Sequence, residues 1–309
     1  MKEKIYITTP IFYVNDVPHI GHAYTSIICD TISRFYRLKN FDVKFLTGTD
    51  EHGQKVESAA KSKKMEVKDF VDNVSKNFLN LGKKLNISNT DFIRTTEERH
   101  KKSVQFFWKE LERRDQIYKS YYEGWYSVKD EAFYQEKELK KIGDAFETFD
   151  GGKVDWIKEE SYFFKLSGWE NRLLEFYDNF PDFIKPESRR NEVINFVKNG
   201  LKDLSISRTS FKWGIKVPQK NAKNHIVYVW IDALVNYLTS IEYPELNEES
   251  KLFWKNSIHI IGKDILKFHA IYWPAMLMSV NLPTPKKIYA HGWWTNEGKK
   301  NFKTFKKNN

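Results

Sequence analysis

Apolar and polar positions recur along the first part of the chain with two periods, one typical of strands and one typical of helices. An apolar run at 4–9 predicts a strand, a helix-like stretch follows at about 21–39, and residues 43–47 predict a second strand. Further helices are predicted at about 54–61, 66–85 and 97–114. Because strands and helices alternate, we expect a parallel sheet with ligands at the carboxyl ends of its strands.

This alternation breaks near Tyr118. Short aromatic strands are predicted at 121–128 and 162–166, separated by charged turns, and helices are predicted at 170–177 and 188–198. Such a change of pattern indicates an insertion into the alternating fold.

Later residues return to the first pattern. The predicted strands are 225–231, 257–261 and 286–290, and the helices between them are 233–240 and 264–280. We therefore predict an α/β protein with a doubly wound parallel sheet. Residues 1–115 and 223–309 form its two halves, and residues 116–222 form the insertion.

Length and composition agree with a packed protein. With 309 residues and 40% hydrophobic content, the chain can bury a sizeable core. No apolar stretch approaches the ~20 residues of a membrane helix, and no leader-like pattern precedes the first strand, so we expect a cytoplasmic protein without a membrane partner. Cys29 is the single cysteine, which excludes an internal disulfide and a multi-thiolate zinc site, and we expect it to be a buried apolar residue.

Net charge does not identify a partner. The value of +10 would suggest a polyanion such as RNA. Residues 299–309 carry five lysines and no acidic residue, so they supply half of it. The remaining excess, about +5 over nearly 300 residues, is also found in ordinary proteins without nucleic-acid partners.

A histidine-rich element stands between the first strand and the first helix. Pro18-His19-Ile20-Gly21-His22 would place two imidazoles at a helix start, where unpaired N–H groups and the helix dipole favour an anion. Gly21 would let the anion approach the backbone, and His19 and His22 could donate hydrogen bonds to a reacting phosphoryl group. These residues by themselves are equally compatible with a chance loop that carries two surface histidines.

The surrounding motifs strengthen the first interpretation. The element, preceded by Thr9-Pro10-Ile11-Phe12-Tyr13, resembles the first signature of the class I aminoacyl-tRNA synthetases, specifically the methionyl enzymes. Four later blocks resemble the same family in the same order: Gly48-Thr49-Asp50-Glu51-His52-Gly53, Tyr228-Val229-Trp230-Ile231-Asp232-Ala233, Ile261-Gly262-Lys263-Asp264-Ile265 with Phe268-His269, and Ala290-His291-Gly292-Trp293-Trp294.

The resemblance implies a Rossmann-like catalytic domain interrupted by a connective-peptide insertion. It also implies a methionine-tRNA ligase that uses ATP with Mg²⁺ to form methionyl-adenylate and then transfers methionine to tRNA(Met). His19 and His22 would be catalytic, and Asp50 would accept the substrate ammonium. On sequence alone, Asp50 could equally cap the following helix.

The resemblance also assigns two binding sets. Methionine-binding residues would be Ile11, Tyr13, Asp50, Trp230, Ala233, Tyr237, Ile265, His269 and Trp273. ATP-binding residues would be His19, Gly21, His22, Gly262, Asp264, Trp294 and Lys300. Without the family, the large aromatic residues would more often be core residues, and Asp264 would be a helix N-cap. A thioether offers no strong hydrogen-bond group, so shape, sulfur–aromatic contacts and one donor such as Tyr13 or His269 would recognise it.

Two regions depart from the family pattern. Ser127-Val128-Lys129-Asp130 stands where a zinc knuckle would have a Cys-x-x-Cys pair, so we predict an insertion without zinc knuckles and no metal ligands in the chain. After Lys300 the Met-Ser-Lys-Ser signature and the anticodon-binding domain are absent. We therefore expect a C-terminally truncated or frameshifted product, or one piece of a split gene, in which tRNA binding is weak or lost.

Three functions stay open at this point. The first is a methionine-tRNA ligase. The second is a weakly active or inactive fragment that binds methionine or ATP without charging tRNA. The third is another His-x-Gly-His nucleotidyltransferase, such as a small cofactor adenylyltransferase.

Overall fold

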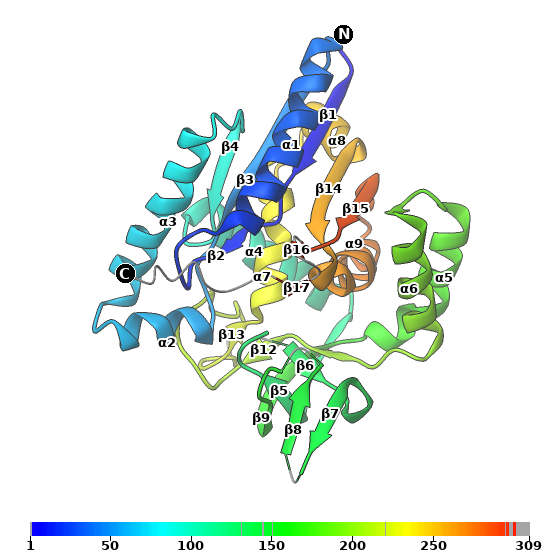
Figure 1. The fold of residues 1–309 in the computed structure, drawn as a ribbon. Coiled ribbons are helices and arrows are strands. Elements are labelled where there is room, and N and C mark those ends of the chain that lie inside the picture. Colours follow the sequence, from blue (N-terminus) through cyan, green and yellow to red (C-terminus); the bar gives the residue numbers. More distant parts are fainter. Residues whose placement is uncertain are drawn as a thin grey trace.

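A computed structural model describes residues 2–130, 132–143, 145–149, 151–219 and 221–293, and the backbone of residues 295, 296, 299 and 300 (Figure 1). Its α-helices are α1 (Ile20–Leu38), α2 (Gln54–Ser62), α3 (Val67–Lys84), α4 (Glu98–Arg113), α5 (Glu170–Asn179), α6 (Glu187–Lys198), α7 (Val229–Thr239), α8 (Glu248–Lys255) and α9 (Trp273–Ser279). The first four agree with the predicted helices to within one residue at each end. No helix of the described residues is both long and apolar enough to cross a membrane.

Within the described residues, one sheet of seven strands forms the centre of the molecule. Its strands are β1 (Lys4–Thr8), β2 (Phe12–Tyr13), β3 (Asp42–Asp50), β4 (Asp91–Arg94), β10 (Ile184–Lys185), β14 (Ser257–Gly262) and β15 (Lys287–His291). Every pairing in this sheet is parallel. The α/β class and the parallel sheet are therefore confirmed.

Helices cover both faces of this sheet, as the alternation of β1 shows. Ile5 and Ile7 point into a cluster with Cys29 of α1. Tyr6 points to the other face, where its hydroxyl donates to the carbonyl of Tyr237 on α7 at 3.0 Å. Burial on both faces is characteristic of a doubly wound sheet. Cys29 is fully buried, as predicted.

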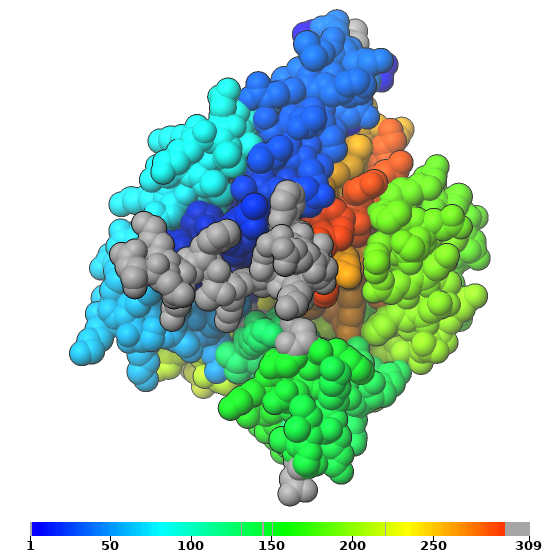
Figure 2. All heavy atoms as spheres, viewed as in Figure 1, coloured from blue at the N-terminus to red at the C-terminus, as the bar shows by residue number. Residues whose placement is uncertain are grey.

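The insertion has its own antiparallel sheet, with strands in the order β11 (Leu204–Ser205), β9 (Asp155–Phe164), β5 (Ile117–Ser127) and β6 (Ala132–Tyr134). A separate hairpin pairs β7 (Leu139–Ile142) with β8 (Ala145–Thr148). Two further strand pairs extend beyond the insertion. β12 (Ser207–Arg208) pairs with β13 (Ile226–Val227), and β16 (Thr295–Asn296) pairs with β17 (Lys299–Lys300) near the end of the described residues. In Figure 2 the antiparallel strands of the insertion, in green, project below the body, on the side toward which the strand arrows of Figure 1 point.

The segment predicted as an insertion is not wholly separate from the central sheet. β10 lies inside residues 116–222, yet it pairs with β15 at the edge of that sheet. Helices α5 and α6 flank β10 in the chain and lie beside the body in Figure 1. The boundaries 1–115, 116–222 and 223–309 stay predictions.

One predicted element is wrong, and another is helical as predicted but not a regular α-helix. The strand predicted at 225–231 extends only over Ile226–Val227, because α7 already begins at Val229. The helix predicted at 264–280 is confirmed, since residues 263–279 are helical throughout, but it begins with a 3₁₀ turn at Lys263–Ile265 and includes a π-helical turn at Phe268–Tyr272 before α9. Short apolar runs rich in β-branched and aromatic residues fit either a strand or a buried helix, and tertiary packing decides between them.

At the place of a zinc knuckle, side chains of the insertion bond directly to one another. The Ser127 hydroxyl donates to Oδ2 of Asp130 at 2.8 Å, and the Tyr134 hydroxyl donates to the same oxygen at 3.1 Å. Among the described residues, no group of three or more His, Cys, Asp or Glu side chains could hold a metal ion. The absence of zinc stays a prediction.

Candidate active site

The histidine element caps α1. His19 has an extended backbone, and its Nδ1 accepts a hydrogen bond from the Gly21 amide at 3.1 Å. The His19 amide in turn donates to Nδ1 of His22 at 3.1 Å, so the two imidazoles form a reciprocal capping box. The predicted approach of an anion to the Gly21 amide is therefore not available in this arrangement, because that amide already has an acceptor.

These bonds also define which ring nitrogens carry protons. Each Nδ1 accepts, so each neutral ring carries its proton on Nε2. Burial, followed by the neighbouring His19, lowers the pKa of His22 to about 3, and burial lowers the pKa of His19. The rings stack with their centroids 3.8 Å apart. At neutral pH the pair can offer Nε2–H donors without carrying charge.

Gly21 is required by the position of the His19 ring. A Cβ at Gly21 would lie 2.9 Å from Cε1 of His19, closer than side-chain carbons approach one another. Any larger residue would displace the imidazole from the cap. Sequence reasoning assigned Gly21 to anion approach, whereas its observed role is to leave room for this ring.

β2 connects the histidine element to the end of β3. The Phe12 ring lies 4.8 Å from the His22 ring, and Tyr13 pairs with Asp50 in the parallel register. Both predicted loops therefore meet at the carboxyl edge of the sheet, as expected from the alternating pattern.

Asp50 is the last residue of β3 and is almost fully buried. α2 begins after Gly53 and has no side-chain cap, so Asp50 does not act as its cap. In the described part of the chain, Oδ1 of Asp50 has no hydrogen-bond partner. Burial, followed by the negative charge of Asp232, raises the pKa of Asp50 well above its usual value. A buried carboxyl oxygen without a partner indicates a place for a ligand's donor.

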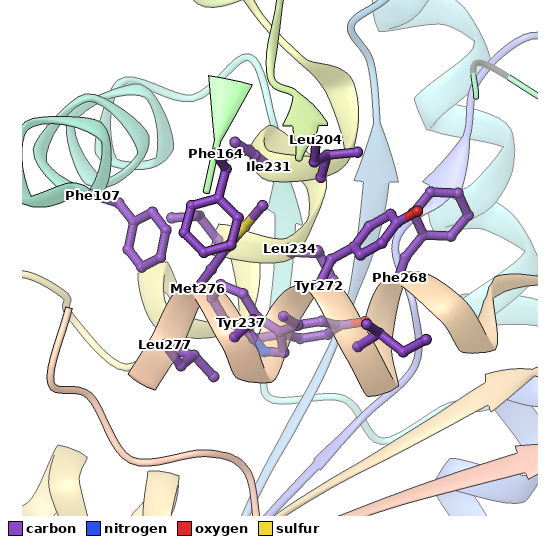
Figure 3. Packing of buried hydrophobic residues seen from close by; sticks show 14 of the residues in the cluster. Phe107, Phe164, Leu204, Ile231, Leu234, Tyr237, Phe268, Tyr272, Met276 and Leu277 are labelled. Carbon is purple, nitrogen blue, oxygen red and sulfur yellow. The ribbon is translucent and has the colours of Figure 1, made fainter. Parts of the chain in front are cut away.

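Stacked side chains of α7 and of the π-helical turn form an aromatic wall, which consists of Trp230, Tyr237, Phe268 and His269. The indole of Trp230 stacks on Phe268 with the centroids 3.6 Å apart and the planes at 6°. Tyr237 of α7 lies against the helical segment that carries Phe268, Tyr272 and Met276 (Figure 3). Within the described residues, Tyr13 Oη and Trp230 Nε1 are buried without hydrogen-bond partners.

Hydrogen bonds within this wall restrict which donors a ligand could meet. Burial is the largest influence on His269 and lowers its pKa to about 4, so the ring is neutral. Its Nδ1 lies 3.0 Å from the carbonyl of Ile265 and must donate there, so its Nε2 accepts from the Tyr237 hydroxyl at 2.8 Å. His269 therefore has no free donor for a ligand in this arrangement. Of the two candidate donors to a thioether, Tyr13 and His269, only Tyr13 has a hydroxyl without a partner among the described residues.

The other predicted methionine-binding residues lie around the same helices. Ala233 is buried on α7, Ile11 precedes β2, and Ile265 ends the 3₁₀ turn. Trp273 is fully buried, with its ring 5.7 Å from Phe107 and 6.3 Å from Trp254. The expected single helical face of Ile265, His269 and Trp273 is wrong in detail, because the π-helical turn interrupts the α-helical spacing.

The turn after β14 carries the predicted adenosine contacts. A Cβ on Gly262 would lie 2.6 Å from Oδ1 of Asp264, so Gly262 leaves room for this carboxylate. Oδ1 of Asp264 accepts from Nε1 of Trp293 at 3.1 Å. Gly262, not Asp264, occupies the N-cap position of the 3₁₀ turn. Trp294 and the side chain of Lys300 lie outside the described residues.

Sequence patterns do not reveal one further feature. Asp232 is fully buried, and its two carboxylate oxygens contact His52 Nδ1 and His100 Nε2, each at 2.7 Å. His100 precedes Asp232 by 132 residues. His52 and Asp232 stand inside recognisable motifs, but their contact exists only in the folded chain.

Comparison with known proteins identifies the family. Residues 5–144 and 140–308 match the family described as "tRNA synthetases class I (M)".

The chain belongs to this family.

A methionine–tRNA ligase of Rickettsia felis is 59% identical over 300 residues, which cover 97% of this chain and 58% of the relative. A methionine–tRNA ligase of Brucella melitensis is 50% identical over 300 residues. The Mycobacterium tuberculosis methionyl-tRNA synthetase in complex with methionyl-adenylate superposes with a TM-score of 0.91 at 47% identity, covering 94% of this chain and 57% of that one. The Rossmann-like class I catalytic fold is thereby confirmed, and the chain spans rather more than half the length of these relatives.

Proposed function

We propose that this chain activates methionine with ATP, forming methionyl-adenylate and pyrophosphate, and passes methionine to tRNA(Met) in the cytoplasm. The observation that carries the proposal is the buried Asp50 carboxyl, one oxygen of which has no hydrogen-bond partner among the described residues. Asp50 is paired in the sheet with Tyr13 of β2, the strand that leads to the histidine cap. An amino acid held by its ammonium at Asp50 would direct its carboxylate toward a nucleotide bound near α1.

The two histidines would act on the α-phosphate. Displacement of pyrophosphate builds negative charge on the phosphoryl oxygens, and Nε2–H donors of His19 and His22 can stabilise it. The rings need not reorganise, because the capping box already holds them. Positioning and donors of this kind are the main tasks of a protein in nucleotidyl transfer.

Other residues would select the substrates. Tyr13, Trp230, Ala233 and Tyr237 provide apolar and aromatic surface suited to a thioether, with Ile11, Ile265, His269 and Trp273 as the remaining proposed contacts. Gly262 and Asp264 would meet the adenosine, together with Trp294 and Lys300. Mg²⁺ would arrive on the phosphates of ATP, since the described residues offer no cluster that would hold it without the nucleotide.

Two comparisons support this proposal. The relatives are named as methionine–tRNA ligases, and one similar structure contains methionyl-adenylate. This chain superposes more closely on the adenylate complex of the Mycobacterium enzyme, at a TM-score of 0.91, than on its free form, at 0.80. The described conformation is therefore more similar to the one that holds methionyl-adenylate. The family match removes the reading as an unrelated cofactor adenylyltransferase.

The test is ATP–pyrophosphate exchange by the purified chain, which requires activation but no tRNA. We expect exchange that depends on methionine and is absent with leucine or cysteine. Charging of tRNA(Met) is then measured separately. Saturable methionine binding without exchange would instead establish a binding fragment, and no binding would overturn the proposal.

A further inference from the structure

A histidine of the central sheet is in contact with the aromatic wall. His259 is the third residue of β14 and is fully buried. Its ring stacks on the ring of Tyr237, with the centroids 4.0 Å apart and the planes at 22°. Tyr237 belongs to the aromatic wall, and its hydroxyl donates to Nε2 of His269 at 2.8 Å. His259 therefore supports a residue of the wall without being one of the proposed methionine contacts.

The neighbouring strand holds the His259 ring. The parallel register of β1 and β14 pairs Thr8 with His259, and Oγ1 of Thr8 lies 2.8 Å from Nδ1 of His259. Burial, followed by the neighbouring His269, lowers the pKa of His259 well below its usual value, so the ring is neutral. Since a hydroxyl can either donate or accept, the bond to Thr8 forms with either neutral tautomer. Both partners are fully buried, so this bond is made away from solvent.

Packing alone does not explain an imidazole at this position. Among the described residues, Nε2 of His259 has no hydrogen-bond partner. A phenyl ring would also stack on Tyr237, and it would leave no buried nitrogen unpaired. What the phenyl ring lacks is the nitrogen that faces Thr8. The bond to Thr8 is therefore the feature that distinguishes the imidazole from an apolar ring here.

Tyr237 is restrained at three places. Its hydroxyl donates to His269, whose other ring nitrogen donates to the carbonyl of Ile265 at 3.0 Å. Its backbone carbonyl accepts from the hydroxyl of Tyr6 at 3.0 Å. Its ring face lies against His259. A hydrogen bond at one end of a ring leaves the ring free to tilt, whereas a stacked neighbour opposes the tilt.

We propose that His259, held by Thr8, is a positioning residue that fixes the tilt of the Tyr237 ring and thereby the width of the methionine pocket. The inference rests on the proposed function, because it takes Tyr237 as a methionine contact. A thioether has no strong hydrogen-bond group, so its recognition depends on the shape of the pocket. A wall that tilts loses contact with methionine and admits a longer side chain. His259 therefore acts on amino-acid binding and selectivity rather than on ATP.

Calorimetry with methionine and with ethionine, whose side chain is one methylene longer, tests the proposal. Thr8→Val removes the hydroxyl while nearly preserving the shape of the side chain, and Thr8→Ser retains the hydroxyl. We expect the Kd for methionine to rise about fivefold with Val and to change by less than about twofold with Ser. The preference for methionine over ethionine should fall by about threefold or more with Val only. A residue needed only for folding would change stability without changing this preference.

Two substitutions at His259 separate the stacked ring from its bond. His259→Phe keeps a ring without the bond, and we expect it to behave as Thr8→Val does. His259→Leu removes the ring as well, and we expect about tenfold weaker methionine binding with the larger loss of preference. The matched control is His225→Phe, at a buried histidine whose Nδ1 lies 2.9 Å from the Ser207 hydroxyl and whose ring meets Tyr162 edge-on. Its methionine affinity and its preference should be those of the unaltered chain.

The outcomes distinguish this inference from the proposed function. If His259→Leu does not fold, the Thr8 pair still tests the bond without altering any ring. Methionine binding by the unaltered chain, with unchanged affinity and preference in the Thr8→Val and His259→Phe variants, would overturn the inference and leave the proposed function intact. Equal weakening of methionine and ethionine binding, or the same change in the His225 control, would also overturn it. No methionine binding by the unaltered chain would overturn the proposed function, and this inference with it.

Discussion

The two sides of the proposed site are built in different ways. The phosphate side consists of neighbouring residues, His19, Gly21 and His22, whose contacts close within a single turn at the start of α1. The amino-acid side is assembled from distant parts of the chain, with Asp232 bonded to His52 and His100 across 180 and 132 residues. Local contacts depend on the backbone of one helix end, whereas the assembled side depends on how α4 and α7 pack. The two sides should therefore respond differently to substitution.

The largest expected effect is on the local side. His19→Ala removes both a phosphate donor and the helix cap, and we expect kcat for exchange to fall by about 10²–10³-fold, the usual loss for a missing oxyanion donor. Methionine binding should change little, because the pocket is built by other elements. Calorimetry with methionine serves as the control. An equal loss of methionine binding would mean that the two sides are not independent.

A smaller effect is expected on the assembled side. Asp50→Asn removes the partner of the ammonium, and we expect KM for methionine to rise by about 10–100-fold, the range for a charge-assisted hydrogen bond. Asp264→Asn is the comparison, since it should alter KM for ATP rather than for methionine. Steady-state exchange kinetics with each substrate varied in turn provide the measurement. An unchanged methionine KM for the Asp50 variant would exclude it as the ammonium partner.

A single methyl group tests the geometry of the cap. Gly21→Ala brings a Cβ within 2.9 Å of the His19 ring, and we expect a rate about tenfold lower as the donor moves. Stability should change by less than about 1 kcal/mol, because better helix propensity offsets a weakened cap. Gly82→Ala in α3 is the matched control, since nothing lies within 4 Å of its added Cβ. Normal exchange by the Gly21 variant would show that the ring's position is not critical.

The same contrast explains what could be predicted from the sequence. The α1 cap involves residues three apart, so the short motif directed attention to both histidines, although their reciprocal capping was seen only in the structure. The Asp232 cluster could not be found in this way, because the histidines become its partners only when α4 lies beside α7. The start of α7 was also missed, since the run around Trp230 is as apolar as a buried strand. Periodicity shows how a segment buries its surface, but not which distant side chain will face it.

The smallest expected effect, a flat pH profile of kcat, distinguishes the two sides most sharply. Because the folded pKa of His22, about 3, lies below its ordinary 6.5, the unfolded chain takes up this proton first on acidification. The contribution of the cap to stability is therefore complete above about pH 6.5 and is lost as the pH falls toward about 3. With methionine saturating, kcat for exchange should change by less than about twofold between pH 6 and 8, since burial lowers the pKa of His19 and lowers that of His22 to about 3. Over the same range kcat/KM for methionine should rise with pH, because burial raises the pKa of Asp50 well above its usual value and the proposed ammonium contact is to the ionised carboxylate. A kcat that fell on acidification with a midpoint near 6.5 would mean that the histidine pair loses its Nδ1 acceptors in the working range, and that the pH dependence belongs to the local side.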